Sequence, residues 1–371
     1  MKNETDLIAV DTVQIALYYP NFKITDINRF GNNTMAFIQN PSRADKAAGF
    51  YKPRLTFNKK SFTNPSDRLF IEASLPKLIY GENVSELRQQ DKNTIAELLT
   101  AHLKDMGVST TPENILQADL KRLDCAKNLI LPKGITATYA LRTLNNTYIS
   151  GQKQKSEIKY INGGAGIALR YAHREFILYD KISDLAASGL SENLSIEKDY
   201  YTQKGLLRLL KELGLYILRL EYRLANRREV RTILHKQGIA NPVLGDIFTP
   251  GLTKNLLVEQ WETLTRNPAP VPVQLSASQK IQQFIKANSK IKLHTALKSL
   301  AFAMLSEELT VDGTLQLLQA HYSKQDIYHL MNKSIEKFPM ETQERELLDG
   351  LSAQLQAWQA LSAEQLIKEN K

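Results

Sequence analysis

The sequence lacks most of the features that mark secreted, membrane-spanning or nucleotide-driven proteins. Cys125 is its single cysteine, so an intramolecular disulfide is impossible and a zinc site rich in thiolates is excluded. No apolar run approaches the length that crosses a bilayer, the first residues show no apolar core of a signal peptide, and no nucleotide-binding loop is present. We therefore expect a protein of the reducing cytoplasm without a membrane segment.

Positive charge is the strongest bias in the composition. The 371 residues carry a formal net charge of +9 on a globular background of 43% hydrophobic and 23% charged residues, which argues against disorder. Nine Lys or Arg residues stand against three Glu between Lys204 and Lys236. Such a stretch suits contacts with nucleic-acid phosphates, although an ordinary solvated helix face would have the same composition.

Periodicity predicts an α+β protein, a largely antiparallel sheet with helices on one face, followed by an all-helical C-terminal domain. Alternating apolar residues predict strands over residues 8–19, 51–57, 68–78, 115–131, 176–181 and 217–224, and suggest a bulge in the fourth. Helical spacing marks residues 94–106, 182–213, 227–237 and 252–265. Three prolines in residues 267–273 cannot belong to a helix. We therefore place a first domain at residues 1–266, a linker at 267–275 and a helical domain at 276–371.

Two of these strands turn polar, reactive side chains onto one face. In residues 176–181, Tyr179 and Lys181 share a face because strand side chains alternate with a period of two. In residues 217–224, Arg219, Glu221 and Arg223 share a face, and leucines point the opposite way. A tyrosine beside a cation, with a carboxylate on a neighbouring strand and a metal ion in attendance, has the chemistry to attack a phosphodiester.

Four segments occur in an order that resembles the gene II replication proteins of filamentous bacteriophages and their phage and plasmid relatives. They are residues 69–84, with a Pro-containing turn and a Gly-Glu-Asn-Val step, residues 121–126, with Lys-Arg-Leu-Asp, residues 178–181, with Leu-Tyr-Asp-Lys, and residues 217–224, with Leu-Arg-Leu-Glu-Tyr-Arg. Each segment alone is a weak signal, but four in one order with similar gaps are much more specific. Members of this family start rolling-circle replication by nicking one DNA strand.

The resemblance implies a role for each matched residue. Tyr179 matches the family's nucleophile and Lys181 its cationic neighbour, while Glu72, Asp124 and Glu221 are the implied ligands of Mg²⁺ or Mn²⁺. The implied reaction is metal-dependent, site-specific nicking and rejoining of one strand at a replication origin through a 5′-phosphotyrosyl intermediate. The link conserves the energy of the phosphodiester, so rejoining would need no ATP.

DNA is the implied partner, as a single-stranded or supercoiled replication origin. The candidate DNA contacts are five arginines of the basic stretch, namely Arg219, Arg223, Arg227, Arg228 and Arg231. The resemblance also implies the cytoplasm of a bacterial host. A host helicase and a homodimer are open alternatives for further partners.

The chemistry of the residues agrees with this assignment. A phenol has an ordinary pKa near 10, so a tyrosine is a poor nucleophile at neutral pH until a base, a cation or a metal stabilises its phenolate. Lys181 could supply that charge. Hard carboxylate oxygens are the ligands that Mg²⁺ prefers.

Simpler structural interpretations exist for the same residues. Tyr171 and Tyr222 are rival tyrosines, and most strand tyrosines are packing residues. Glu221 between two arginines could be a rung of a cross-strand ion-pair ladder. Pairing with a neighbouring arginine would explain the other two carboxylates without a metal.

A different class of function is also open. The six histidines never form the His-hydrophobic-His strand pair by which many nicking enzymes bind metal, so the carboxylate variant remains. Alternatively, the chain is a non-catalytic origin- or operator-binding protein with a helix-turn-helix over residues 317–338. A helical packing or oligomerisation module would fit those residues equally well. Magnesium-dependent nicking of supercoiled plasmid separates the enzyme from the binder.

Overall fold

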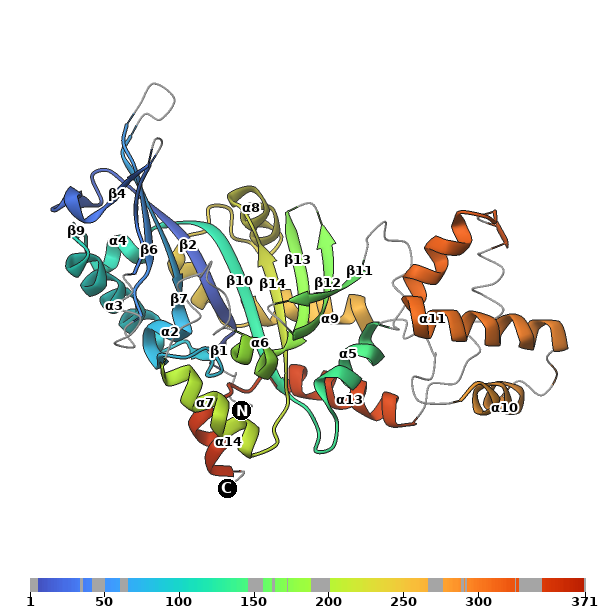
Figure 1. The fold of residues 1–371 in the computed structure, drawn as a ribbon. Helices are drawn as coiled ribbons and strands as arrows, with labels where there is room; N and C mark the ends of the chain where they lie inside the picture. Colours follow the sequence, from blue (N-terminus) through green and yellow to red (C-terminus); the bar gives the residue numbers. More distant parts are fainter. Residues whose placement is uncertain are drawn as a thin grey trace.

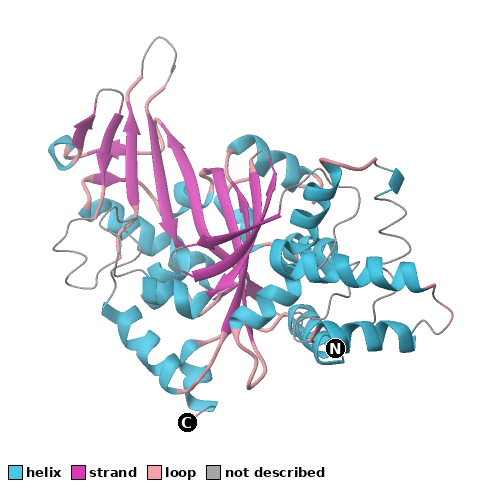
Figure 2. Cartoon of the chain, turned by 45° about the vertical axis from the view of Figure 1, so that its right-hand side comes forward, coloured by secondary structure: helices cyan, strands magenta, loops and turns pink. Residues whose placement is uncertain are grey.

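The computed structural model describes residues 6–33, 36–41, 51–60, 66–145, 156–161, 164–171, 173–187, 201–265, 276–287, 290, 292–323, 325–326 and 342–369. The centre of this described part is a twisted ten-stranded sheet in which every neighbouring pair of strands is antiparallel (Figures 1 and 2). In spatial order the strands are β11 (Ser156–Ile161), β12 (Gly164–Tyr171), β13 (Arg174–Asp180), β14 (Ile217–Leu224), β10 (Asp119–Ile130), β2 (Val10–Tyr18), β7 (Arg68–Ser74), β6 (Arg54–Asn58), β5 (Ala36–Gln39) and β4 (Gly31–Asn33).

Two short strand pairs and a set of helices complete the described fold. The pairs are β1 (Leu7–Ile8) with β8 (Leu87–Arg88) and β3 (Lys23–Ile24) with β9 (Val108–Ser109). The helices are α2 (Leu75–Tyr80), α3 (Asp91–Asp105), α4 (Pro112–Leu116), α5 (Ala137–Asn145), α6 (Lys181–Ala187), α7 (Tyr201–Glu212), α8 (Arg227–His235), α9 (Leu252–Thr265), α10 (Ala277–Ala287), α11 (Leu293–Gln319), α13 (Thr342–Ala357) and α14 (Ala363–Glu369), with the 3-10 helices η1 (Ile27–Arg29) and η2 (Leu244–Phe248). The predicted α+β class is confirmed.

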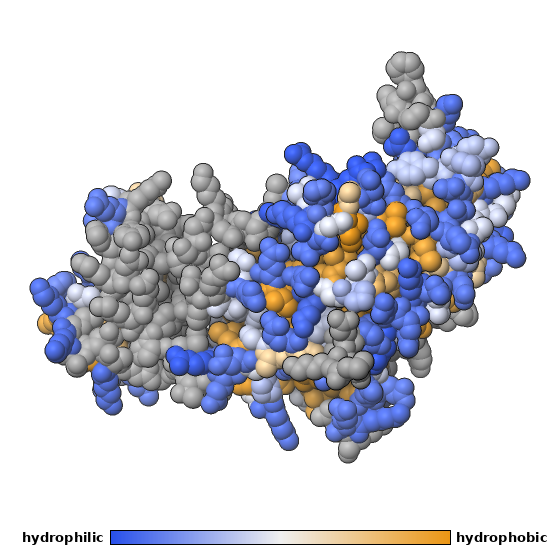
Figure 3. Space-filling model, turned by 180° about the vertical axis from the view of Figure 1, so that it is seen from behind, coloured by the Kyte–Doolittle hydropathy of each residue, from blue (hydrophilic) through white to orange (hydrophobic). Residues whose placement is uncertain are grey.

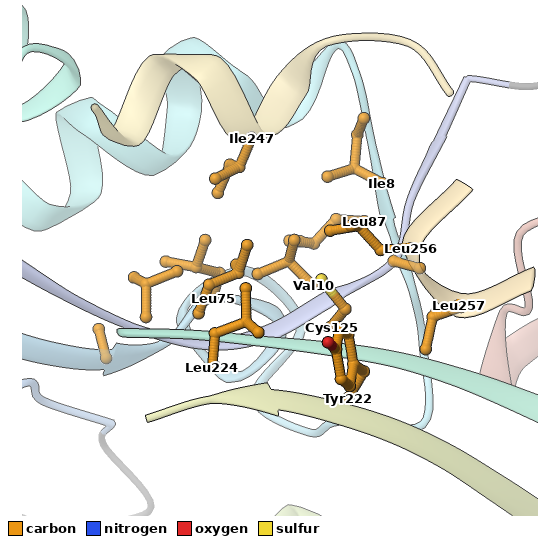
Figure 4. Close-up of a cluster of buried hydrophobic side chains, with 14 of the residues drawn as sticks. Ile8, Val10, Leu75, Leu87, Cys125, Tyr222, Leu224, Ile247, Leu256 and Leu257 are labelled. Carbon is orange, nitrogen blue, oxygen red and sulfur yellow. The ribbon is translucent and has the colours of Figure 1, made fainter. Parts of the chain in front are cut away.

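The alternation read from residues 217–224 gives the sheet one apolar and one polar face. Leu218, Leu220, Tyr222 and Leu224 are at most 1% exposed and belong to the main hydrophobic core. Figure 4 shows part of this core, where Cys125, Tyr222 and Leu224 lie below the α9 side chains Leu256 and Leu257. Full burial of such a side chain stabilises the fold by roughly 1.5–3 kcal/mol. Helix packing therefore fixes which face of the central strands is left for polar residues.

Strand β10 lies at the centre of the sheet, between β14 and β2. Its pairing with β2 shifts register between Leu120 and Arg122 and again between Asp124 and Cys125, which confirms the suggested bulge. Bulges re-aim side chains, and these two flank Arg122 and Asp124 on the polar face.

Helix α13 packs against β10 of the sheet and α14 packs against α7, whereas α10 and α11 lie to one side of the sheet (Figure 1). Gln354 of α13 accepts a hydrogen bond from the Ile130 nitrogen and donates one to the Ile130 carbonyl oxygen, at 3.0 and 2.8 Å. Trp358 donates to the Leu7 carbonyl oxygen at 3.2 Å. The expected linker at residues 267–275 lies outside the described residues, so the division into domains stays a prediction.

The predicted strands 68–78 and 115–131 each extend too far, into a neighbouring helix. Residues 75–78 form the start of α2 instead of continuing β7, because Pro76 cannot donate to a sheet ladder and suits the first turn of a helix. Residues 112–116 form α4, with Pro112 in its first turn and Thr111 as its N-cap, so β10 begins only at Asp119.

Hydrophilic residues cover most of the described surface on the side opposite to that of Figure 1, and hydrophobic residues show there in patches (Figure 3). Among the described helices, none is long and apolar enough to cross a membrane.

Candidate active site

Tyr179 and Glu221 face each other on neighbouring strands. Ile177 of β13 pairs with Glu221 of β14, so Tyr179, two residues further along, is its diagonal neighbour on the polar face. The Tyr179 hydroxyl donates a hydrogen bond to Oε2 of Glu221 at 3.1 Å. The two residues are only 4% and 3% exposed. The fold therefore brings the predicted nucleophile into direct contact with one of the predicted carboxylates.

This contact fixes where the proton rests. Burial raises the pKa of Tyr179 well above its ordinary value, Glu221 adds to the rise, and Arg219 opposes it. Burial also raises the pKa of Glu221, but Arg223 and Arg219 outweigh burial and hold that pKa below its ordinary value. The proton thus stays on the phenol and the negative charge on the carboxylate. Because Tyr179 is buried, a phosphate reaches its oxygen only after the side chains covering it move.

Asp124 of β10 pairs with Arg223 of β14, is therefore the diagonal neighbour of Glu221, and is 1% exposed. Arg122 donates to its two oxygens, from Nε at 3.0 Å and from a terminal nitrogen at 2.5 Å. Burial raises the pKa of Asp124 to about 7, although Arg122 opposes the rise, and the charge of Glu221 adds to it. Asp124 and Glu221 are therefore close enough to interact electrostatically.

Glu72 lies farther away, on the other side of Arg122. A terminal nitrogen of Arg122 is 3.4 Å from Oε1 of Glu72. Strand β2 separates β7 from β10, so Glu72 is three strand spacings from Glu221, or about 14 Å across the sheet. Ligand distances near 2 Å make this separation too large for one shared ion.

The fit of a metal ion can be judged from these positions. Within the part of the chain that the structure describes, no three His, Cys, Asp or Glu side chains gather as a metal-binding group. Asp124 and Glu221 nevertheless offer hard oxygens on adjacent strands, and Mg²⁺ is commonly held by one or two carboxylates together with substrate phosphates. The donor chemistry of this pair fits Mg²⁺ or Mn²⁺, and Glu72 does not join the pair.

Arg219 lies on the polar face near the start of β14 and is 2% exposed. One terminal nitrogen lies 2.8 Å from Oδ2 of Asp11, and the other donates to the Asn83 carbonyl oxygen at 2.8 Å and to Oδ1 of Asn128 at 3.2 Å. Asp11 also accepts a hydrogen bond from the Ser74 hydroxyl at 3.1 Å. Both terminal nitrogens of Arg219 are therefore occupied by partners within the protein.

Lys181 does not lie on the strand, as its spacing from Tyr179 predicted, but begins α6 directly after β13, where it is 1% exposed. Its ammonium nitrogen lies 3.1 Å from Oδ2 of Asp184 and 6.0 Å from the centroid of the Tyr179 ring. The predicted cation is therefore close to the aromatic ring, while the hydroxyl itself is bonded to Glu221.

The Gly-Glu-Asn-Val step and the residues just after it contact the part of β10 that holds Lys127 and Asn128. Glu86, just after it, accepts from Lys127 at 2.8 Å, from the Asn128 nitrogen at 2.7 Å and from the Leu361 nitrogen at 2.9 Å. The Val84 carbonyl oxygen accepts from the Asn128 amide at 2.8 Å. This step is a buried polar junction between β10 and the segment that leads into α14.

The remaining predicted DNA contacts differ in exposure. Arg227 and Arg228, in the first turn of α8, are exposed, and Arg227 pairs with Asp119 at 2.8 Å. Arg231 is half-buried and hydrogen-bonded to Asn241. The fifth arginine, at position 223, is also half-buried and binds Glu221 and Glu175 at 2.9 and 3.9 Å. Of the five predicted DNA contacts, Arg227 and Arg228 at the start of α8 are therefore the two that are open to solvent.

The described residues test one of the rival interpretations, the one that concerns Tyr222. Tyr222 points into the apolar core, on the opposite face of β14 from Glu221. The side chain of Tyr171 and most of the suggested helix-turn-helix lie outside the described residues.

Sequence reasoning missed Asp11, Glu86 and Lys127. Each is a charged residue less than 10% exposed, and Asp11 and Lys127 lie in strands β2 and β10. A charge within a predicted central strand was the available signal, because such a group is costly to bury without a partner.

Comparison with known proteins adds one match. No curated protein and no solved structure matches the chain. The family model for the N-terminal region of the phage replication-associated protein, the gene II protein, matches residues 50–238, which is just over half of the chain and includes the Tyr179 and Glu221 strands. The chain therefore belongs to the family of the filamentous-phage gene II-type replication initiators.

Proposed function

We propose that this replication initiator nicks and rejoins one DNA strand at an origin, with Tyr179 as the nucleophile. The hydrogen bond from the Tyr179 hydroxyl to Glu221 carries the proposal. Through this bond the Glu221 carboxylate is a proton acceptor for the tyrosine of the family's Tyr-x-Lys segment. The family match supports the role in replication, and the strand chemistry is what we add to it.

In the proposed reaction the Tyr179 phenol, which holds its proton in the free protein, passes that proton to Oε2 of Glu221 as attack on the DNA begins. The phenolate oxygen attacks phosphorus, the bond to the 3′-oxygen breaks, and Glu221 can return the proton to that oxygen as it leaves. The product is a 5′-phosphotyrosyl link and a free 3′-hydroxyl that primes synthesis. Attack by a 3′-hydroxyl on the link reverses these steps and rejoins the strand.

A divalent metal belongs to this proposal. Asp124 and Glu221 would hold Mg²⁺ or Mn²⁺, which when bound neutralises charge that develops on the phosphate. Glu72 would act from a distance, through Arg122, which contacts both Glu72 and Asp124. Lys181 would add positive charge beside the ring of Tyr179.

The DNA is proposed to cross the sheet near the first turn of α8, where Arg227 and Arg228 are exposed. Phosphate contacts of this kind give affinity that falls with salt. The setting would be the cytoplasm of a bacterial host, where a host helicase would extend the unwinding from the nick and a second copy of the chain would supply a second nicking site.

The variant Tyr179→Phe tests the nucleophile. It should abolish the covalent protein–DNA adduct on supercoiled or single-stranded origin DNA with Mg²⁺, because phenylalanine has no oxygen to attack phosphorus. Origin binding should stay nearly intact, and mass spectrometry of the wild-type adduct should find the nucleotide on the peptide that contains Tyr179. Tyr216→Phe is a matched control, since Tyr216 is 37% exposed and lies just before β14.

An undiminished adduct in Tyr179→Phe would refute the assignment. A wild-type protein that binds origin DNA and leaves supercoiled plasmid intact in Mg²⁺ or Mn²⁺ would instead establish the non-catalytic binder.

A further inference from the structure

Arg219 occupies an unusual position beside the proposed nucleophile. It is the direct cross-strand partner of Tyr179 in the β13–β14 register, so the two side chains start about 5 Å apart on the same face. Its terminal nitrogens are committed to Asp11, Asn83 and Asn128. Its Nε is buried and has no hydrogen-bond partner among the described residues. A buried donor without a hydrogen-bond partner costs free energy, so an oxygen that accepts a hydrogen bond from Nε would recover that cost.

We propose that Arg219 is a catalytic residue, which donates from Nε to an oxygen of the reacting phosphodiester, and that Asp11 is its positioning residue. The inference rests on the proposed nicking function and deepens it, because it assigns Arg219 to the reacting phosphate instead of to DNA binding at large. A planar guanidinium suits this task, since it recognises phosphate oxygens with a fixed fork of donors.

The geometry explains why Asp11 is needed. Its carboxylate holds one terminal nitrogen of Arg219 at 2.8 Å and is itself held by the Ser74 hydroxyl at 3.1 Å. With both terminal nitrogens tied back, the orientation of the guanidinium, and therefore of its Nε, is fixed before DNA arrives. Donors fixed in advance where charge develops are the main source of electrostatic catalysis.

The other charged groups around Tyr179 do not take this place. Glu221 accepts the phenol's hydrogen bond, and Lys181 is paired with Asp184. Arg223 is held by Glu221. Arg219 is the buried cation in register with the phenol that keeps an unused donor.

The test separates a catalytic role from a structural one and from DNA binding. Removing Asp11 or Arg219 alone would leave a buried charge without its partner, so the main variant exchanges both, Asp11→Asn with Arg219→Gln. Arg219→Lys is the second variant, because it keeps the charge and loses the fork. The matched control is Asp6→Asn with Arg88→Gln, an ion pair of 3.4 Å whose side chains are 43% and 40% exposed. Folding is checked by circular dichroism, origin affinity by fluorescence anisotropy, and chemistry by the single-turnover rate of adduct formation.

We expect both Arg219 variants to bind origin DNA with wild-type affinity and salt dependence, because Arg219 is buried. The double variant should form adduct about 100-fold more slowly, the typical effect of losing one such donor, and Arg219→Lys should fall between it and the wild type. The control should match the wild type in both measurements. A wild-type adduct rate in either folded variant would overturn the inference, as would a loss of affinity without loss of rate at saturating DNA. The proposed function would fail separately, by the absence of a wild-type adduct or its persistence in Tyr179→Phe.

Discussion

Replacement of Glu86 by Gln should destabilise the protein strongly, although Glu86 touches no proposed reacting group. The Glu86 and Lys127 side chains are each 4% exposed and 2.8 Å apart. Oε2 of Glu86 accepts from Lys127 and from the Leu361 nitrogen, and Oε1 accepts from the Asn128 nitrogen. An amide has a single acceptor oxygen, so either Asn128 or the Lys127–Leu361 pair loses its partner, and Lys127 becomes a buried charge without a counter-charge. Breaking a buried pair from one side costs about 3–5 kcal/mol.

Urea denaturation followed by circular dichroism measures this cost. With a slope of about 3 kcal/mol per M, the upper end of the ordinary range, the midpoint should fall by about 1–2 M. Glu364→Gln is the control, since its pair with Lys368 on α14 has side chains 76% and 71% exposed and should leave the midpoint where it is. A loss below about 1 kcal/mol for Glu86→Gln would refute the view that this junction holds α14 and β10 together.

Three further outcomes follow from the site. Alanine at Arg227 or Arg228 should each lower the slope of log affinity against log salt by about 0.7–0.9 and leave the cleavage rate at saturating DNA unchanged; unaltered slopes would remove α8 from the DNA surface. Glu221→Gln should abolish cleavage or raise the metal concentration needed for it, and an unchanged metal titration would leave Glu221 a structural residue. Burial raises the pKa of Asp11, but Arg219 and other cations outweigh burial and lower it to about 2. Because the folded-state pKa lies below the unfolded value near 3.8, stability from this group is present above about pH 4 and is lost as the pH falls through 2. The free energy of unfolding from urea denaturation should fall by roughly 2 kcal/mol more for the wild type than for Asp11→Asn over that window, and a constant difference would contradict the pKa.

The local features of the sheet were predictable because they depend on spacing alone. The period-two pattern of residues 217–224 placed Arg219, Glu221 and Arg223 on one face, and the structure has them there, with the leucines in the core. The Tyr-x-Lys segment was likewise placed on a strand, although that strand ends at Asp180 and Lys181 already begins α6.

The order of the strands could not be predicted, and it decides which carboxylates meet. The three-carboxylate interpretation needs β7, β10 and β14 to be close neighbours. Strand β2, from the first 18 residues, inserts between β7 and β10 and moves Glu72 away from Glu221. Nothing local in residues 69–84 or 121–126 encodes that insertion, because strand order is set by long-range packing.

The same inserted strand shows that the site extends beyond the region that the family model matches. The match begins at residue 50, yet β2 supplies the strand beside β10 and, in Asp11, the carboxylate that holds Arg219. At the other end, Gln354 of α13 binds β10, and the Leu361 segment between α13 and α14 binds Glu86; both lie far outside the match. A buried cation is tolerable only where its counter-charge is fixed, so the Arg219 strand inside the match depends on a partner outside it. The polar face is therefore a product of the whole chain's packing, and the four segments that identify the family account for only part of it.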